Sequence, residues 1–265
     1  MGFDLFRRMK IVIIGGTGLI GSRLARRLRD RGHDVLAAAP ATGVDTVTGE
    51  GLAKALEGAL VVVDVSNSPA FDEATAMHFF ETSTSNLLRA EAITGAGHHV
   101  ALSVVGTEHL TESGYFRAKL AQERLIARSP IPYSIVRATQ FFEFITSIAN
   151  SATMVGTVRL PPVHIQPMAA DDVASELERV AVGSPVNGTV EIAGPQLFRL
   201  DDLVRRALAA RDDRREVVAD PDVPYFSAHV TERTLVPQGE SRLGSVRFDD
   251  WLRGERVTSQ QPSSA

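Results

Sequence analysis

Apolar residues along the first half of the chain follow two alternating patterns. Short runs of consecutive aliphatic residues are typical of strands buried on both faces, and stretches with apolar residues three or four apart are typical of helices. The predicted strands are 10–14, 34–39, 60–65, 99–105 and 133–137, and the predicted helices begin at 19 and span 50–56, 71–94 and 114–128. Strands alternating with helices predict a parallel sheet with helices on both faces, a Rossmann-like, doubly wound α/β fold.

Beyond about Phe141 the pattern becomes less regular. Asp171 or Asp172 is the expected N-cap of one later helix, and Asp201 is the expected N-cap of the next. The later strands are predicted at 157–160, 163–167, 189–193 and 216–219, and the later helices at 171–182 and 201–211.

The expected organisation is one structural unit with a small lobe. Residues 1–140 form the sheet core, and residues 141–253 form mainly a C-terminal substrate lobe that returns one strand to the sheet. Residues 254–265 are polar and are expected to be a frayed tail.

Composition narrows the class of protein. The 265 residues are 44% hydrophobic and 23% charged, which is ordinary for a globular protein, and the net charge of −4 favours neither a nucleic-acid nor a membrane partner. The absence of cysteine excludes disulfides, thiolate catalysis and cysteine–zinc sites. No apolar run has the length of a signal-peptide core or a membrane span, so the expected location is cytoplasmic.

The strand at 10–14 leads directly into a glycine-rich turn and then into a helix. Gly15, Gly16, Gly18 and Gly21 satisfy both G-x-G-x-x-G and G-x-x-G-x-x-G. Glycines permit a tight turn with close backbone approach, and the helix N-terminus offers N–H groups to a pyrophosphate. In this context the motif predicts that residues 1–140 bind a dinucleotide.

Tyr115 and Lys119 stand four residues apart on the predicted helix 114–128, which places both on one helix face. An ammonium group favours phenolate over phenol, and a phenol can donate a proton to a carbonyl that receives hydride. The same spacing also occurs by chance in many helices. The Tyr115–Lys119 pair follows the predicted strand that contains Ser103, in the same sheet as the glycine turn. This position favours a role in proton transfer over a chance occurrence.

These segments resemble the short-chain dehydrogenase/reductase superfamily, in particular its atypical NmrA-like NAD(P)-binding branch. The likeness rests on IVIIGGTGLIGSRL, on LSVVGT followed by the Tyr115–Lys119 pair, and on IVRATQFF and QPMAADDVA, and it covers most of residues 10–200. The resemblance implies that Tyr115 is the acid–base and that Lys119 also binds the nicotinamide ribose. It also implies a catalytic serine at the end of the preceding strand. Ser103 lies one residue early for that role, and Thr107 is the alternative.

The residues after the second predicted strand determine which cofactor is preferred. Pro40 and Thr42 stand there, and neither an acidic residue nor an arginine is present. An acid would bind the ribose of NAD and repel the 2′-phosphate of NADP, so NADP(H) is favoured over NAD(H), with Thr42 as a donor and Arg23 as a helper. The expected cofactor contacts are Gly15, Thr17, Gly18, Leu19, Ile20, Gly21, Pro40, Thr42, Ser66, Asn67, Ser103, Lys119 and Thr139.

The expected substrate contacts follow the strand at 133–137 or come from the lobe: Phe141, Phe142, His164 and Met168. Core packing remains the alternative for the two phenylalanines, and a structural hydrogen bond remains the alternative for the histidine. For Glu143, which stands next to these phenylalanines, a structural role and a role in the substrate site both remain open.

No spacing of His, Asp and Glu indicates a metal site, and His98-His99 is expected at the surface.

Two classes of function remain. The first is an NAD(P)H-dependent oxidoreductase that transfers hydride to or from a small carbonyl or quinone-like substrate. The alternative is a non-catalytic, NAD(P)-sensing regulatory protein of the NmrA-like type, and an isomerase or cyclase stays open as a third reading. By analogy alone, the helices 71–94 and 114–128 would pair in a dimer.

Overall fold

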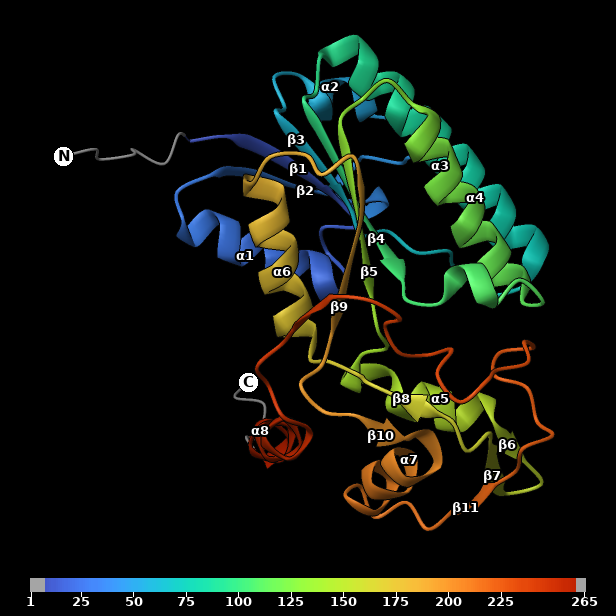
Figure 1. The fold of residues 1–265 in the computed structure, drawn as a ribbon. Helices are drawn as coiled ribbons and strands as arrows, with labels where there is room; N and C mark the ends of the chain where they lie inside the picture. The colour runs from blue at the N-terminus through green and yellow to red at the C-terminus, as the bar shows by residue number, and fades with distance from the viewer. Residues whose placement is uncertain (1–7, 261–265) are drawn as a thin grey trace. The chain divides into compact units, whose positions relative to one another are not determined.

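The computed structural model describes residues 8–260 and divides into two compact units (Figure 1). Within the described residues, unit 1 combines 8–103, 117–136 and 174–190, and unit 2 combines 104–116, 137–173 and 191–260. The boundary predicted near residue 140 stays a prediction. Among the residues that the structure describes, no helix is both long and apolar enough to cross a membrane.

A seven-stranded parallel sheet confirms the predicted fold class. The strands run in the order β12-β9-β5-β4-β3-β1-β2, and β1 pairs in parallel with β2 and with β3. The bounds are β1 (Lys10–Ile14), β2 (Asp34–Ala38), β3 (Val61–Asp64), β4 (His98–Val104), β5 (Tyr133–Ala138), β9 (Gly188–Ala193) and β12 (Ser241–Leu243). Two late strands, β9 and β12, lie in this sheet, where the sequence predicted one.

Helices cover both faces of the sheet in unit 1, as the alternating pattern requires (Figure 1). α1 (Leu19–Asp30) and α6 (Ala170–Val182) lie on one face, and α2 (Leu52–Leu56), α3 (Glu73–Thr94) and α4 (Gly114–Arg128) lie on the other. The strands between these layers are apolar on both sides. Ile11, Val12 and Ile13 of β1 are therefore fully buried.

A buried carboxylate joins α1 to α6. Glu178 of α6 is almost fully buried and accepts a hydrogen bond from Arg27 Nε at 2.6 Å. Arg31, at the end of α1, forms an ion pair with the same carboxylate, and Arg27 also donates to Ser175 Oγ at 2.8 Å. These contacts link two helices that are about 150 residues apart in sequence.

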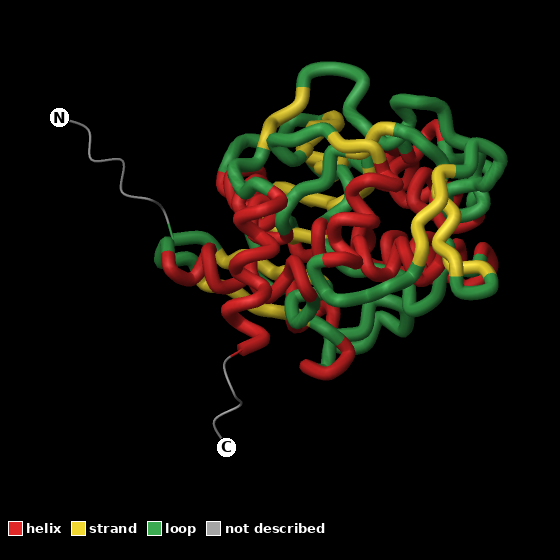
Figure 2. Tube along the Cα trace, turned by 90° about the horizontal axis from the view of Figure 1, so that it is seen from below, coloured by secondary structure: helices red, strands yellow, loops and turns green. Residues whose placement is uncertain are grey.

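Unit 2 is built around aromatic side chains. Phe142, Phe248 and Trp251 pack with ring centroids 5.4–6.1 Å apart in one buried cluster. Figure 2 shows the helices, strands and loops of the described residues along the Cα trace. The remaining elements are α5 (Ile145–Ser151), β6 (Thr153–Met154), β7 (Thr157–Leu160), β8 (His164–Ile165), β10 (Phe198–Arg199), α7 (Leu200–Ala209), β11 (Glu216–Ala219) and α8 (Phe248–Gln260).

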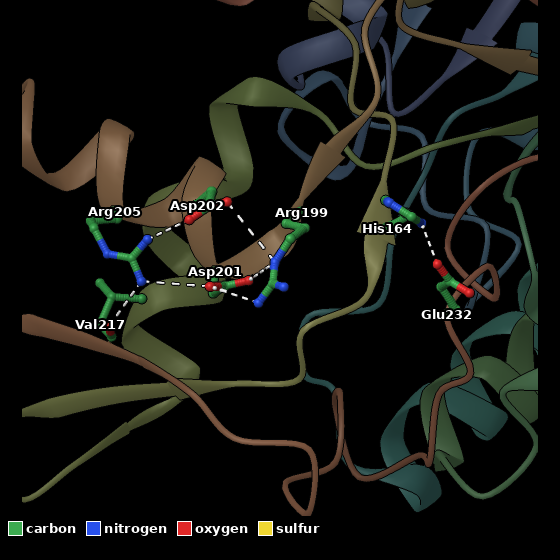
Figure 3. A network of polar contacts seen from close by, with 7 residues as sticks. All are labelled: His164, Arg199, Asp201, Asp202, Arg205, Val217 and Glu232. Atoms are coloured by element: carbon green, nitrogen blue, oxygen red, sulfur yellow. Dashed lines mark hydrogen bonds and ion pairs between the residues drawn. The ribbon is translucent and has the colours of Figure 1, made fainter.

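The prediction that Asp201 caps a helix is wrong. α7 begins at Leu200 with Arg199 as its N-cap residue, and no side chain bonds there. Asp201 instead lies nearly buried between Arg199 and Arg205, as Figure 3 shows. The ion pairs compensate the desolvated carboxylate, which explains why it points along the helix surface rather than to the helix N-terminus.

The expected cap of α6 is also different, because the helix begins at Ala170. Asp172 accepts hydrogen bonds from the backbone N–H groups of Ser245 and Val246, both at 2.9 Å. The Ala170 N–H is bound by Glu143, whose two carboxylate oxygens each lie at 3.2 Å. A residue from a different element therefore serves as the cap.

The segment from residue 254, expected as a frayed tail, is helical as far as Gln260, because α8 continues to that residue. The last part of the predicted tail, residues 261–265, lies outside the described residues.

We predict that E143A lowers the free energy of unfolding by about 1–2 kcal/mol, because it removes the acceptor for the Ala170 N–H and for Trp251 Nε1. E143Q should lose less, since it keeps one oxygen at the same place. Urea denaturation measures both variants. Equal stability of E143A and wild type would contradict the capping role.

Candidate functional site

The turn between β1 and α1 needs glycine for three different reasons. Gly15 adopts φ of +76°, which favours glycine. A Cβ on Gly16 would lie 2.6 Å from Ala37 Cα of β2, and a Cβ on Gly21 would lie 2.2 Å from the carbonyl oxygen of Gly15. The glycines therefore let β1, β2 and α1 approach one another closely.

The N-terminus of α1 faces this turn with free donors. The first intrahelical bond runs from Ser22 N to Gly18 O at 3.0 Å, so the N–H groups of Leu19, Ile20 and Gly21 precede the helical ladder. The first turn of α1 contains no acidic residue, and Thr17 and Gly18 are exposed. The turn thus offers an anion backbone donors and the positive end of a helix dipole.

The segment after β2 is a short 3-10 turn, Pro40–Thr42. Thr42 Oγ1 accepts a hydrogen bond from Ala39 N and donates to Ala39 O, both at 2.9 Å. Its single hydroxyl proton is therefore used locally, although Thr42 is expected to donate to a 2′-phosphate. Arg23, the expected helper, donates to Leu19 O at 2.9 Å.

The end of β3 lies directly against the glycine turn. A Cβ on Gly15 would be 2.9 Å from the N and Cα atoms of Ser66. Asp64 Oδ1 holds Ser66 through the Ser66 N–H at 2.9 Å and the hydroxyl at 2.6 Å. The structure therefore brings Ser66 to the turn, as expected from its place after a strand, and leaves Asn67 exposed.

Lys119 is buried inside unit 1, with 3% of its surface exposed. Its Nζ donates to Leu102 O at 2.8 Å and to Gln122 Oε1, and it lies 4.5 Å from the centre of the Phe80 ring. Burial lowers its pKa to about 8, against the opposing effect of Asp64. The ammonium group thus has three partners within the unit.

Tyr115 packs against the aromatic core of unit 2, with its ring centroid 5.4 Å from that of Phe116. Burial raises the pKa of its phenol above the ordinary value, so the group stays protonated at neutral pH. As expected, Tyr115 and Lys119 share the helix α4 and stand one turn apart.

The two hydroxyls considered for the serine role differ in their surroundings. Ser103 is buried, and among the described residues its Oγ has no hydrogen-bond partner. Thr107 Oγ1 donates to Val104 O at 2.7 Å, so its proton is already used. Ser103 is therefore the freer of the two hydroxyls.

The expected substrate residues lie in unit 2. Phe142 and Met168 belong to its interior, with at most 1% exposed, whereas Phe141 stacks on the half-exposed Phe144 at 5.4 Å. His164 Nδ1 lies 3.5 Å from Glu232 Oε1 (Figure 3).

The expected cofactor contact Thr139 also lies in unit 2. It is buried and donates from Oγ1 to Gln166 O at 2.7 Å.

The expectation that His98 and His99 lie at the surface is wrong. β4 begins at His98, and both side chains are buried. His99 Nδ1 bonds Glu91 Oε1 at 2.8 Å. Burial lowers the pKa of His99, but the charge and hydrogen bond of Glu91 outweigh it and leave the pKa raised. In the part of the chain that the structure describes, no group of three His, Asp or Glu side chains could hold a metal ion.

Two residues that connect these elements, Asp64 and Gln122, were not among the site residues predicted from the sequence. Gln122 Nε2 donates to Asp64 Oδ2 at 3.0 Å and so joins β3 to α4. An acidic residue that ends a run of three valines was an available indication for Asp64, because a buried carboxylate requires partners.

A parallel sheet with a glycine-rich turn at the end of its first strand is typical of dinucleotide-binding α/β proteins. Residues 11–84 match the NAD dependent epimerase/dehydratase family. This match agrees with the resemblance to the short-chain dehydrogenase/reductase superfamily that the sequence predicts, and it covers the segment that contains the glycine turn. The chain's position in the NmrA-like branch stays a prediction.

Two curated proteins that are similar to this chain have names that indicate different functions. The chain is 25% identical over 215 residues to the photosystem II assembly factor Ycf39 of Synechocystis sp., which covers 69% of this chain and 65% of the relative. It is 29% identical over 162 residues to a (4-alkanoyl-5-oxo-2,5-dihydrofuran-3-yl)methyl phosphate reductase of Streptomyces griseus, which covers 56% and 54%. The chain thus spans less than two thirds of either relative.

Solved structures confirm the fold over nearly the whole chain. A dTDP-4-dehydrorhamnose reductase of Clostridium acetobutylicum superposes with a TM-score of 0.71, at 16% identity, over 95% of this chain and 100% of its own. A dTDP-4-dehydrorhamnose reductase of Bacillus anthracis in complex with NADP gives 0.69 at 13% identity, over 96% and 99%. A dTDP-glucose 4,6-dehydratase of Streptomyces venezuelae with NAD bound gives 0.69 at 18%, over 96% and 98%.

We predict that G18A weakens NADP⁺ binding with little loss of folding stability, whereas G21A weakens both. Gly18 has φ of −79° and its added Cβ would be 3.3 Å from Gly15 O, so G18A should change the free energy of unfolding by less than about 0.5 kcal/mol. Its methyl group on the exposed turn should still weaken NADP⁺ binding about tenfold or more. G21A should lose both binding and stability because of its clash.

Calorimetry and urea denaturation measure these effects, with G239A as the control because its added Cβ meets open space. Unchanged NADP⁺ affinity of G18A would show that the dinucleotide does not occupy this turn.

We predict that the buried pair of Glu91 and His99 stabilises the folded protein less as the pH rises. Because the pKa of His99 is raised in the folded protein, its stabilisation is fully present below the ordinary value of 6.5 and is lost as the pH rises through the raised pKa. The stability difference between wild type and E91Q should therefore shrink between about pH 6 and about pH 9. Urea denaturation checks this, with exposed Glu81 (E81Q) as the control. A difference that does not change with pH would refute it.

Proposed function

We propose that the protein is an NAD(P)H-dependent reductase or dehydrogenase that transfers hydride between C4 of the nicotinamide and a small carbonyl or quinone-like substrate. The observation that supports this most is the exposed glycine turn at the start of α1, because its backbone N–H groups can donate to a coenzyme diphosphate. The relative in Streptomyces griseus is named as a reductase, which supports a reductive reaction.

Tyr115 is the proposed proton donor. When hydride reaches the carbonyl carbon, the carbonyl oxygen gains a negative charge and takes the phenolic proton, and the reverse reaction returns it. A raised phenol pKa suits a group that must be protonated before the reaction. We keep Lys119 as the cation of the site rather than as a ribose ligand, because its ammonium group already has three partners.

NADP(H) is the proposed coenzyme. The segment after β2 contains no carboxylate that would repel a 2′-phosphate. Structures of the same fold bind NADP in one case and NAD in another, so the choice depends on this local chemistry. Comparing the affinities of NADP⁺ and NAD⁺ by calorimetry tests the assignment.

A second candidate function is a nucleotide-responsive assembly or regulatory protein without turnover. The engagement of the Lys119 ammonium inside unit 1 favours it, as does the likeness to a relative named as an assembly factor. Incubation with NADPH and a panel of carbonyl and quinone compounds distinguishes the two functions. Tight NADPH binding without any loss of nicotinamide absorbance would favour the second candidate.

We predict that Y115F lowers turnover by about 100-fold or more, since a positioned acid contributes roughly that much. The affinity for NADPH should stay within about twofold, because the phenol is not part of the glycine turn. Steady-state oxidation of NADPH and calorimetry measure the two quantities. Y133F is the matched control, since Tyr133 is a half-buried tyrosine at the start of β5 that has no role in the proposed site. Full turnover in Y115F would overturn the assignment of the acid.

A further inference from the structure

One buried carboxylate fixes the strand end on which the glycine turn rests. Asp64 is the last residue of β3 and is 2% exposed. Its Oδ1 accepts from both the N–H and the hydroxyl of Ser66, and Ser66 backbone atoms would lie 2.9 Å from a Cβ on Gly15. Asp64 therefore holds its negative charge beside Ser66, and the backbone of Ser66 lies directly against the glycine turn. This turn is the proposed site of an anionic ligand.

The other oxygen of Asp64 leads to a buried cation. Gln122 Nε2 donates to Asp64 Oδ2 at 3.0 Å, and Gln122 Oε1 accepts from Lys119 Nζ. Lys119 is as buried as Asp64, and its Nζ also contacts Leu102 O and the Phe80 ring. The buried carboxylate of Glu123 also acts on Lys119 electrostatically. Within unit 1 the amide of Gln122 thus links one buried anion to one buried cation.

We propose that Asp64 and Lys119 form a buried charge pair, joined through Gln122, whose net charge sets how tightly the neighbouring glycine turn binds a dinucleotide diphosphate. The inference rests on the proposed dinucleotide binding and deepens it. Both residues are positioning residues: Asp64 places Ser66 under the turn, and Lys119 balances the charge of Asp64 so that the diphosphate is not repelled.

The balance depends on pH. Burial lowers the pKa of Lys119 to about 8, while Asp64 and Glu123 oppose this shift. The other titratable groups packed nearby are Glu91 and His99, and His99 also senses Asp64. Above about pH 8 Lys119 loses its proton, the pair becomes an anion, and a diphosphate beside it should bind more weakly.

The test measures the Kd of NADP⁺ by calorimetry at constant ionic strength from about pH 7 to about pH 9.5, where the phosphates of the ligand are fully ionised. In wild type the Kd should rise about fivefold through pH 8. K119M leaves Asp64 without its cation at every pH, so its Kd should already be raised about fivefold at pH 7 and should not change through pH 8. K119R keeps the positive charge, so its Kd should stay low throughout.

K54M is the matched control, because Lys54 is an exposed lysine of α2, and it should follow the wild-type profile. The K119M profile also separates Lys119 from His99, whose titration persists in that variant. A flat wild-type profile, or the same rise in K119M as in wild type, would overturn the inference. If K119M does not fold, the K119R profile separates Lys119 from His99, because arginine does not titrate in this pH range and its Kd should not rise through pH 8. Absence of NADP⁺ binding by wild type at pH 7 would instead refute the proposed function.

Discussion

The close approach of the Gly15 carbonyl to the Cα of Gly21 is the constraint on which the nucleotide-binding half of the structure depends. No side chain fits at position 21, because an added Cβ would lie 2.2 Å from that carbonyl oxygen. The contact brings the start of α1 down onto the end of β1 and leaves the first amides of the helix facing outward. Strand, turn and helix are therefore arranged by steric exclusion before any ligand is present.

The interior of unit 1 also encloses ionisable side chains. Asp64, Lys119, Glu91 and His99 are all almost fully buried, and each has a hydrogen-bonded partner. Burying such groups costs free energy unless they are paired, so their partners must be fixed with the fold. The same pairing gives the interior a charge that follows pH, which an aliphatic core would not have.

The sequence predicted the features that depend on local patterns. The strand 10–14, the helix 114–128 and the glycine turn are all present, because aliphatic runs and glycine spacing act through neighbouring residues. It did not predict that His98 and His99 are buried, since their partners, Ser134 on β5 and Glu91 on α3, come from other elements. Asp201 and Asp172 looked like caps for the same reason: their actual partners, Arg205 and the backbone at Ser245, are set by tertiary contacts.

The bond between Glu178 and the two arginines of the first helix region has a consequence for synthesis of the chain. Arg27 and Arg31 leave the ribosome long before residue 178 does, so α1 forms while its carboxylate partner is still missing. A nascent chain that ends near the middle of the sequence has the glycine turn but lacks α6 over that face of the sheet. The complete set of contacts that hold α1 in unit 1 therefore exists only after the residues of α6 have been synthesised.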